Sequence, residues 1–273
     1  MAFDLDFLFE IRRCELEALR PLLPPPPARV LEIGAGAGVQ ASALAALGYL
    51  LTAVDVESSC YAETQVYPVQ RYDGRRLPFP SGAFDAIYSS HVLEHVRPDD
   101  LPALHREMQR VLAPGGRAVH IVPTTSWRLW TSLTHFPTVG REVAASAVRL
   151  LEGRSGPSSS APATFDAAAP HANAARSLAR RAIESGLRFV ERRHGERGNV
   201  VTELYHFSRG AWRDSLTSAG WTILAAADAP LFYSGNMLMG RRLSLERRAR
   251  LVRALGSAGH VFLLAARSGR EPK

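Results

Sequence analysis

Lysine is almost absent from this chain. Lys273 is the only lysine among 33 basic residues, and the formal net charge is +7. The arginines are scattered and carry few aromatic neighbours, whereas a specific nucleic-acid site shows a basic stripe on one face. The arginine bias is typical of a GC-rich genome, so we do not expect nucleic acid as a partner.

Cysteine and long apolar runs are also scarce. Cys14 and Cys60 are the only cysteines, too few for a disulfide framework or a zinc cluster. No apolar run is long enough to span a bilayer. The first residues, Met1 to Asp6, are acidic and lack the basic start of a signal peptide. We expect a cytoplasmic protein, and 273 residues are enough for one domain with an insertion.

The most informative segment is a glycine-rich turn between two apolar runs. Val30–Ile33 reads as a buried strand, Gly34–Gly38 as a tight turn and Val39–Leu47 as a helix. Tyr49–Val56 reads as a second strand that closes with Asp55. Glycines let a backbone approach a ligand, and a carboxylate about 20 residues on can accept hydrogen bonds from a ribose. The unit therefore predicts a nucleoside site.

Two details separate this turn from a dinucleotide site. The glycine spacing is G-x-G-x-G, whereas the dinucleotide fingerprint is G-x-G-x-x-G. Glu32 also precedes the first glycine by two residues, and a carboxylate there would repel a pyrophosphate. A cation without phosphate, such as S-adenosylmethionine (SAM), is compatible with it.

Further blocks follow in a fixed order. Arg71–Gly74 ends a third strand, and Ala86–Ser90 is a fourth. Leu112–Gly116 is expected to end the next helix, and Arg117–Val122 to form a fifth strand. Across residues 28–123 the chain resembles class I SAM-dependent methyltransferases, in the branch of the ubiquinone-pathway enzymes (methyltransferase type 11).

The resemblance implies the fold and the domain organisation. It implies an α/β, Rossmann-like fold with a seven-stranded, mostly parallel sheet, helices on both faces and an inserted cap. The last two strands would form a hairpin with one antiparallel member. We expect the following parts: an N-terminal helix and proline linker (1–27), the SAM-binding half (28–123), an insertion with a flexible loop near 153–163 (124–203), and the C-terminal half of the sheet (204–273).

The resemblance also implies the cofactor contacts. Glu32 is expected near the methionine end of SAM, Asp55 on the ribose hydroxyls and Asp73 on the adenine amino group. The full set expected to bind SAM is Glu32, Gly34, Ala35, Gly36, Gly38, Asp55, Val56, Asp73, Gly74, Ser89 and Ser90.

The segment His91–His95 has the pattern H-x-x-E-H, which in a metallopeptidase binds zinc from a helix. Here it follows a predicted strand, so we do not expect a peptidase. Relatives in the ubiquinone and small-RNA branches carry E-x-x-E-H here and bind a divalent cation, whereas this chain has His91 in place of the first glutamate. We expect no metal, and keep a site made of His91, Glu94 and His95 as the weaker alternative.

Methyl transfer to oxygen requires that the donor, the methyl group and the acceptor are aligned. A hydroxyl acceptor also benefits from a general base whose pKa lies near the working pH. His91, His95 and His206 are the candidates, with His91 ranked first. The stripe Trp127–Phe136 reads as a pocket lid, as core or as a peripheral contact with a membrane surface.

The sequence predicts only the chemical class of the methyl acceptor. The polar, glycine-containing stretch His194–Asn199 suits a hydroxyl-rich acceptor, so we expect O-methylation of a sugar, a glycan or another small molecule. The alternative is a tailoring enzyme for a quinone or another natural product, with tryptophans lining an aromatic pocket. An RNA methyltransferase and a SAM-fold protein without catalysis are further alternatives, and the oligomeric state stays open.

Overall fold

The computed structural model describes residues 5–57, 65–135 and 193–267. The glycine- and serine-rich loop expected near 153–163, the end of the tryptophan stripe at Phe136, and Cys60 lie outside the described residues.

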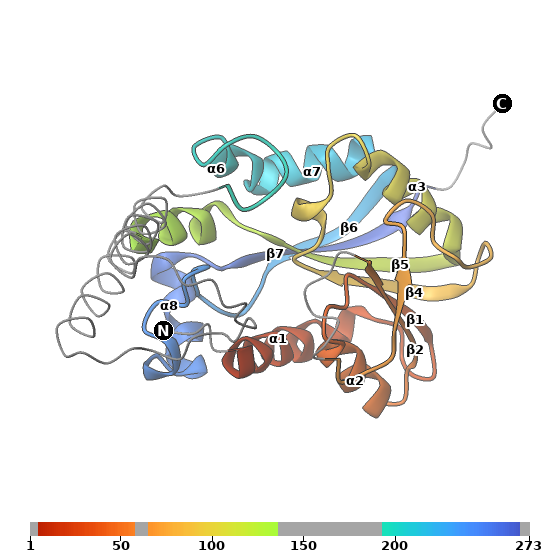
Figure 1. Ribbon diagram of the computed structural model, residues 1–273, viewed down its shortest axis with the longest axis horizontal. Coiled ribbons are helices and arrows are strands. Elements are labelled where there is room, and N and C mark those ends of the chain that lie inside the picture. The colour runs from red at the N-terminus through yellow and green to blue at the C-terminus, as the bar shows by residue number, and fades with distance from the viewer. Residues whose placement is uncertain (1–4, 58–64, 136–192, 268–273) are drawn as a thin grey trace, which may run out of the picture.

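A seven-stranded sheet forms the centre of the molecule (Figure 1). Its strands are β1 (Arg29–Ile33), β2 (Leu50–Val56), β3 (Val69–Tyr72), β4 (Phe84–Ser90), β5 (Leu112–Pro123), β6 (Trp221–Asp228) and β7 (Gly259–Ala266). The order across the sheet is β3-β2-β1-β4-β5-β7-β6. Strand β7 pairs antiparallel with both of its neighbours, and the other neighbouring pairs are parallel. The expected fold class is therefore confirmed, including the single antiparallel strand.

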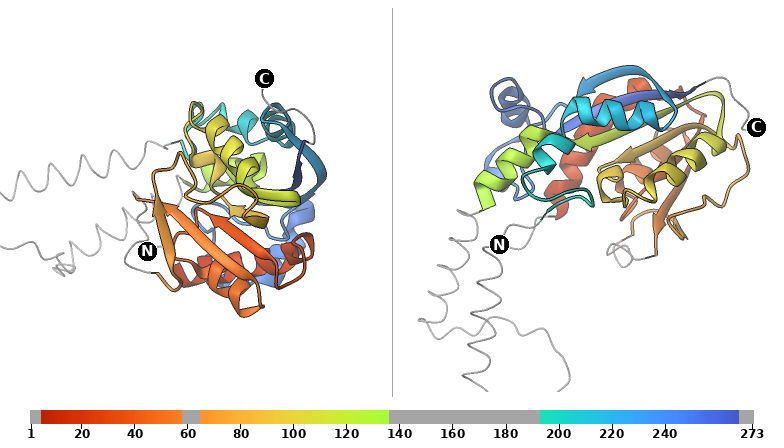
Figure 2. Two further views of the ribbon diagram at one scale, coloured as in Figure 1. Left: turned by 90° about the vertical axis from the view of Figure 1, so that its right-hand side faces the viewer. Right: turned by 90° about the horizontal axis from the view of Figure 1, so that it is seen from above.

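Helices cover both faces of this sheet. They are α1 (Leu5–Leu19), α2 (Val39–Ala46), α3 (Leu101–Val111), α6 (Glu203–His206), α7 (Arg209–Ser218), α8 (Leu245–Leu255), a helix at residues 125–135, and the short turns η1 (Arg20–Leu22), η3 (Leu93–His95) and η4 (Gly240–Arg242). Figures 1 and 2 show α1 and α2 on one face and α3 and α7 on the other. Among the described residues, no helix is both long and apolar enough to cross a membrane.

The buried sides of these elements follow from their sequence patterns. The last four residues of β1 are buried and β4 is largely so, as expected for parallel strands covered on both faces. In α1 the apolar residues recur at helical spacing, and Phe7, Ile11 and Leu16 enter the core. Leu8, on the same helix, lies instead on a cavity wall.

One expected boundary is wrong. Leu112–Gly116 does not end the preceding helix, because α3 ends at Val111 and β5 begins at Leu112. Leu112 already pairs with Phe84 at the start of β4, and the register then shifts before Ala86 pairs with Arg117. Pairing with β4 thus begins at Leu112 and resumes at Arg117, and the residues between them form an irregular stretch in which Gly115 has a φ of 76°.

Two core histidines predict a loss of stability in mild acid. His120 is fully buried against Ser89 and Trp221, and His105 accepts a hydrogen bond from Trp221. Burial lowers the pKa of His120 to about 3 and that of His105 to about 4. Below roughly pH 6.5 both histidines take up a proton in the unfolded chain but stay neutral in the folded chain. The free energy of unfolding is therefore unaffected by them above that pH and decreases as the pH falls below it.

The substitution His120→Gln should remove one of these contributions. The free energy of unfolding of the wild type should fall more steeply between pH 6 and pH 4, by roughly 1.4 kcal/mol per pH unit relative to the variant. Urea denaturation across this range measures both slopes. Equal slopes would show that His120 is not held neutral by burial.

Candidate functional site

The carboxyl ends of β3, β2, β1 and β4 meet at one edge of the sheet, where ligands bind in open α/β folds. The glycine loop follows β1 at this edge. Gly34, Gly36 and Gly38 all have positive φ angles, of 70°, 56° and 79°. Gly34 and Ala35 donate backbone hydrogen bonds to the Val54 carbonyl. The loop is thus fixed to β2 in a conformation that glycine adopts without strain.

Asp55 joins the end of β2 to this loop. Its Oδ2 accepts a hydrogen bond of 3.0 Å from Gly36 N, and its Oδ1 one of 2.8 Å from Val56 N. The carboxylate is 8% exposed, with Arg71 Nη1 at 3.9 Å from Oδ2. In this structure Asp55 therefore organises the loop as well as facing the edge of the sheet.

Asp73 and Gly74 extend the same edge beyond β3. Asp73 Oδ1 accepts hydrogen bonds from the backbone N–H groups of Arg75 and Arg76, which lower the pKa of the exposed carboxyl. Gly74 has φ +76°, and a Cβ there would lie 3.3 Å from Val56. The ends of β2 and β3 are therefore in close contact.

Glu32 lies beneath the loop and not on a cavity wall. It is 2% exposed, and its Oε2 has no hydrogen-bond partner among the described residues. Burial, with a smaller contribution from the charge of Asp55, raises the pKa of Glu32 to about 8. The carboxyl group is therefore largely protonated at neutral pH.

A cavity of about 330 Å³ opens beside the glycine loop. Of the residues proposed from the sequence, it brings together Gly34, Ala35, Gly36, Ser90, His91 and His95. Helix α1 adds Arg12, and distant segments add Trp127, His194 and Tyr233. Its lining residues include no aspartate or glutamate. The site is therefore a cavity that combines the glycine loop with aromatic side chains, three histidines and one guanidinium.

His91 is held by a buried network. Tyr233 donates to Glu15 Oε1 at 2.9 Å and accepts from Arg12 Nη1 at 2.8 Å, and His91 Nε2 lies 3.1 Å from the same hydroxyl. Because the tyrosine hydrogen is used by Glu15, His91 Nε2 is assigned as a donor to Tyr233. His91 Nδ1 then faces Glu94 Oε1 at 3.5 Å. Both ring nitrogens face partners, and the residue has a left-handed φ of 54°.

Three histidines surround the carboxylate of Glu94. His91 Nδ1, His194 Nε2 and His95 Nε2 lie 3.5, 3.9 and 4.0 Å from its Oε1. The ligand atoms of Glu94, His95 and His194 all lie within 4.8 Å of one another. Neither oxygen of Glu94 has a hydrogen-bond partner among the described residues. Burial raises the pKa of Glu94 to about 8 and lowers that of His194 to about 3.

The two tryptophans of the stripe Trp127–Phe136 pack inward, whereas Leu133 is exposed. Trp127 is 5% exposed, lines the cavity and packs on His194 with ring centroids 4.4 Å apart. Trp130 donates from Nε1 to the Leu255 carbonyl and packs on Phe232. Leu133 is 55% exposed. These positions favour the pocket-wall and core interpretations, and membrane contact stays a prediction.

The remaining proposed residues lie elsewhere. The Ser89 hydroxyl bonds to His120 in the core, and Gly38 packs on Tyr67. His206 lies on a second cavity that shares no lining residue with the first. Sequence reasoning placed His194 near the acceptor only as part of the stretch His194–Asn199, and it did not assign Arg12 or Tyr233 to the site. Arg12 lies on an amphipathic helix before the first strand, which offered a signal, whereas Tyr233 had none.

Comparisons with known proteins show the family of this chain. A family model described as a methyltransferase domain matches residues 8–226. The chain is 38% identical over 110 residues to a demethylmenaquinone methyltransferase of Mycolicibacterium gilvum, covering 40% of this chain and 46% of that protein. It is 39% identical over 114 residues to a ubiquinone biosynthesis O-methyltransferase of Xanthomonas campestris, covering 38% and 46%. The chain thus spans about half the length of these curated relatives.

A solved structure supports the fold over nearly the whole chain. The SAM-dependent methyltransferase from Mesorhizobium loti superposes with a TM-score of 0.51 at 17% identity and covers 92% of this chain and 97% of its own. Together with the domain match over most of the sequence and the glycine loop at the edge of the sheet, this shows that the chain belongs to the class I SAM-dependent methyltransferases.

Proposed function

We propose that the protein transfers the methyl group of SAM to a hydroxyl of a small, ring-bearing acceptor. The observation that carries the proposal is the 330 Å³ cavity, whose lining includes the glycine loop together with aromatic rings and histidines. SAM supplies an activated methyl on a sulfonium, so the protein's main task is to align the methyl and the acceptor oxygen in line.

The cofactor would lie along the carboxyl ends of the strands. The Gly34–Gly36 backbone offers a surface without side chains, and Arg12 borders the same cavity. The guanidinium of Arg12 is suited to the carboxylate of the methionine end. Asp55 is proposed to accept from the ribose hydroxyls, and Val56 with Gly74 to contact adenine. Ser90 lies beside the proposed position of the methyl.

Replacing Asp55 tests this placement. We expect Asp55→Asn to weaken S-adenosylhomocysteine (SAH) binding by about 1.5–3 kcal/mol, roughly 10- to 150-fold, because the charged acceptor is lost and the amide keeps only one oxygen for the N–H groups of Gly36 and Val56. Calorimetric titration measures the change. Asp85→Asn is the matched control, since Asp85 pairs with Arg29 near the start of β4, away from the loop. Equal affinity in wild type and Asp55→Asn would remove Asp55 from the site.

The acceptor is proposed to be phenol-like or quinol-like, in preference to a sugar. Phe9, Trp127 and Tyr233 give the cavity aromatic walls, and no carboxylate lines it to accept hydrogen bonds from several sugar hydroxyls. Quinone-pathway names among the partial relatives are consistent with this choice. Of the proposed bases, His95 has the most exposed ring, with 47% of its side chain accessible, whereas both nitrogens of His91 face partners. His95 therefore replaces His91 as the first candidate, and His206, on the other cavity, is not included.

Labelled SAM tests the acceptor class. The protein would be incubated with simple catechols, with hydroquinones and with methyl glycosides, and the transfer of the labelled methyl would be measured for each. Transfer to the phenolic compounds supports the proposal. Transfer to the glycosides alone would overturn the phenolic acceptor and return the sugar to first place.

A metal-assisted variant of this function is favoured by one observation, the donor set around Glu94. Two imidazoles and one carboxylate suit Zn²⁺, Mn²⁺ or Fe²⁺ better than Mg²⁺. Glu94, His95 and His194 would hold the ion, and such an ion would polarise an acceptor hydroxyl. If it binds, His95 is a ligand and not the base, because a neutral imidazole offers one lone pair.

Metal titration decides between the metal-assisted and the metal-free mechanism. Calorimetry with Zn²⁺ and Mn²⁺ should show one site per chain, and Glu94→Gln should weaken it at least tenfold. Asp85→Asn is the control, because this half-exposed carboxylate pairs with Arg29 near the start of β4, away from the cluster. Absence of binding to the wild-type protein, or equal binding by Glu94→Gln, would leave the metal-free mechanism.

A further inference from the structure

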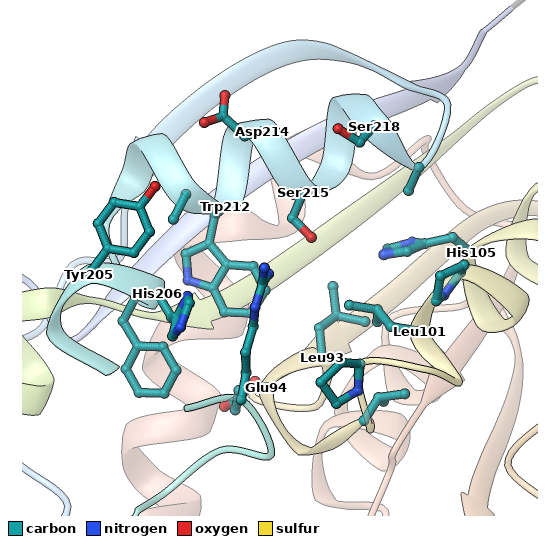
Figure 3. A pocket seen from close by; sticks show the side chains of 17 residues that line it. Leu93, Glu94, Leu101, His105, Tyr205, His206, Trp212, Asp214, Ser215 and Ser218 are labelled. Carbon is teal, nitrogen blue, oxygen red and sulfur yellow. The ribbon is translucent and has the colours of Figure 1, made fainter. Parts of the chain in front are cut away.

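A second cavity, of about 430 Å³, lies on the face of the sheet that carries α3 and α7. Figure 3 shows it between α7, the short helix α6 and the segment from η3 to α3. Leu93, Leu101, Phe207 and Trp212 form much of its wall. Phe207 and Trp212 are nearly parallel, with an interplanar angle of 12° and centroids 6.3 Å apart. The cavity is thus a mainly apolar space with flat aromatic sides.

This cavity is separate from the proposed SAM site. The two cavities have no lining residue in common, although Glu94 of this cavity is adjacent in sequence to His95 of the other. Three acidic or basic side chains lie at the second cavity: Arg197 and Asp214 are exposed, and Glu94 is buried, which raises its pKa to about 8 and favours its neutral form. The interior therefore presents few charges to a ligand.

His105 supplies one hydrogen-bond donor inside this cavity. The indole Nε1–H of Trp221 can only donate, and it lies 3.0 Å from His105 Nδ1. His105 Nδ1 must therefore accept, and the ring proton is on Nε2. This Nε2 has no hydrogen-bond partner among the described residues, although the residue is only 2% exposed. In Figure 3 the ring of His105 points from α3 toward the space below α7.

A buried donor without a partner costs free energy, and a ligand oxygen would recover it. The donor is neutral, because burial lowers the pKa of His105 to about 4. An anion would find no positive charge beside it, since Arg197 lies at the exposed end. An uncharged acceptor oxygen on a flat apolar body fits both the donor and the walls.

We propose that this cavity is a second small-molecule site, which binds an uncharged, ring-bearing compound through a hydrogen bond from His105 Nε2 to a carbonyl or ether oxygen. The site does not depend on the proposed methyl-transfer function.

Two probes of equal shape test the hydrogen bond. Benzophenone carries a carbonyl between two rings, and diphenylmethane has the same rings without the oxygen. Quenching of tryptophan fluorescence reports binding, since Trp212 lines the cavity. The wild-type protein should bind benzophenone roughly three- to tenfold more tightly than diphenylmethane. Equal affinity for the two, or no binding of either, would overturn the proposal.

Substitutions then locate the site. His105→Gln keeps an acceptor for Trp221 and a donor for the ligand, so it should retain the preference for benzophenone, whereas His105→Phe should lose it. Ser215→Phe fills the cavity from α7, where Figure 3 shows the serine pointing inward, and should abolish the binding of both probes while SAH binding is unchanged. Thermal denaturation confirms that each variant folds. Competition between benzophenone and SAH, or undiminished probe binding by Ser215→Phe, would place the probe elsewhere and contradict the proposal.

Discussion

Glu203→Ala should lower the free energy of unfolding by about 3–5 kcal/mol, the range for removing one partner of a buried ion pair. Arg128 Nε lies 3.0 Å from Glu203 Oε2, and the two side chains are 1% and 0% exposed. The other oxygen, Oε1, accepts 2.7 Å hydrogen bonds from the backbone N–H groups of His194 and Gly195. The substitution would remove the acceptor of both bonds and leave a buried guanidinium without this carboxylate.

Urea denaturation measures this loss. Two further variants serve as a surface control and as an apolar replacement of the buried pair. Glu196→Ala, which breaks the exposed pair with Arg193, should cost at most about 1 kcal/mol. The double variant Arg128→Met, Glu203→Leu should recover the part of the loss that comes from the buried guanidinium, because an apolar pair removes that charge. The part that comes from the N–H groups of His194 and Gly195 should persist, since leucine offers no acceptor. A loss below about 1 kcal/mol for Glu203→Ala would show that the pair is not desolvated as the structure indicates.

Glu203 also connects stability to the site. By fixing the backbone at His194 and Gly195, it holds the His194 ring between Trp127 and the carboxylate of Glu94. The helix at residues 125–135 and the segment after residue 193 therefore contribute Trp127 and His194 to the cavity wall, and Glu203 of α6 holds that segment in place.

The sheet could be predicted because its signals are local. Strands β1, β2 and β4 are short, mainly apolar runs, and Gly34, Asp55 and Asp73 lie at or just after the carboxyl ends of β1, β2 and β3. Parallel strands end at a common edge, so residues at strand ends come together without any knowledge of distant contacts. The same reasoning placed Ser90 and His91 beside the glycine loop.

The partners of these residues could not be predicted, because they are distant in sequence. Tyr233 is 142 positions from His91 and 218 from Glu15. His194 reaches Glu94 only through a turn whose conformation depends on Glu203. Periodicity identifies which face of an element is buried, but it does not identify which two buried faces meet. For this reason the sequence, which ranked His91 first as the base, did not show that the Tyr233 hydroxyl lies against its Nε2.

The conformation of Gly34 leads to the second large prediction. Its φ is +70°, and a Cβ added there would overlap Val92 Cγ2. An alanine would carry about 1–2 kcal/mol of backbone strain and about 1–3 kcal/mol of overpacking, so Gly34→Ala should cost about 2–5 kcal/mol of stability. Urea denaturation measures the loss, and SAH affinity should fall because the loop must move away from Val54.

Two companion variants separate strain from overlap. Gly210→Ala is the matched control, because nothing lies within 4 Å of its added Cβ and its φ is outside the left-handed region; this substitution should stabilise the protein by up to about 1 kcal/mol. Adding Val92→Ala to Gly34→Ala removes the overlapping side chain and should restore the packing part of the loss while the backbone strain persists. If Gly34→Ala instead matched Gly210→Ala in stability and bound SAH normally, the loop would not hold the left-handed conformation on which the proposed SAM site depends.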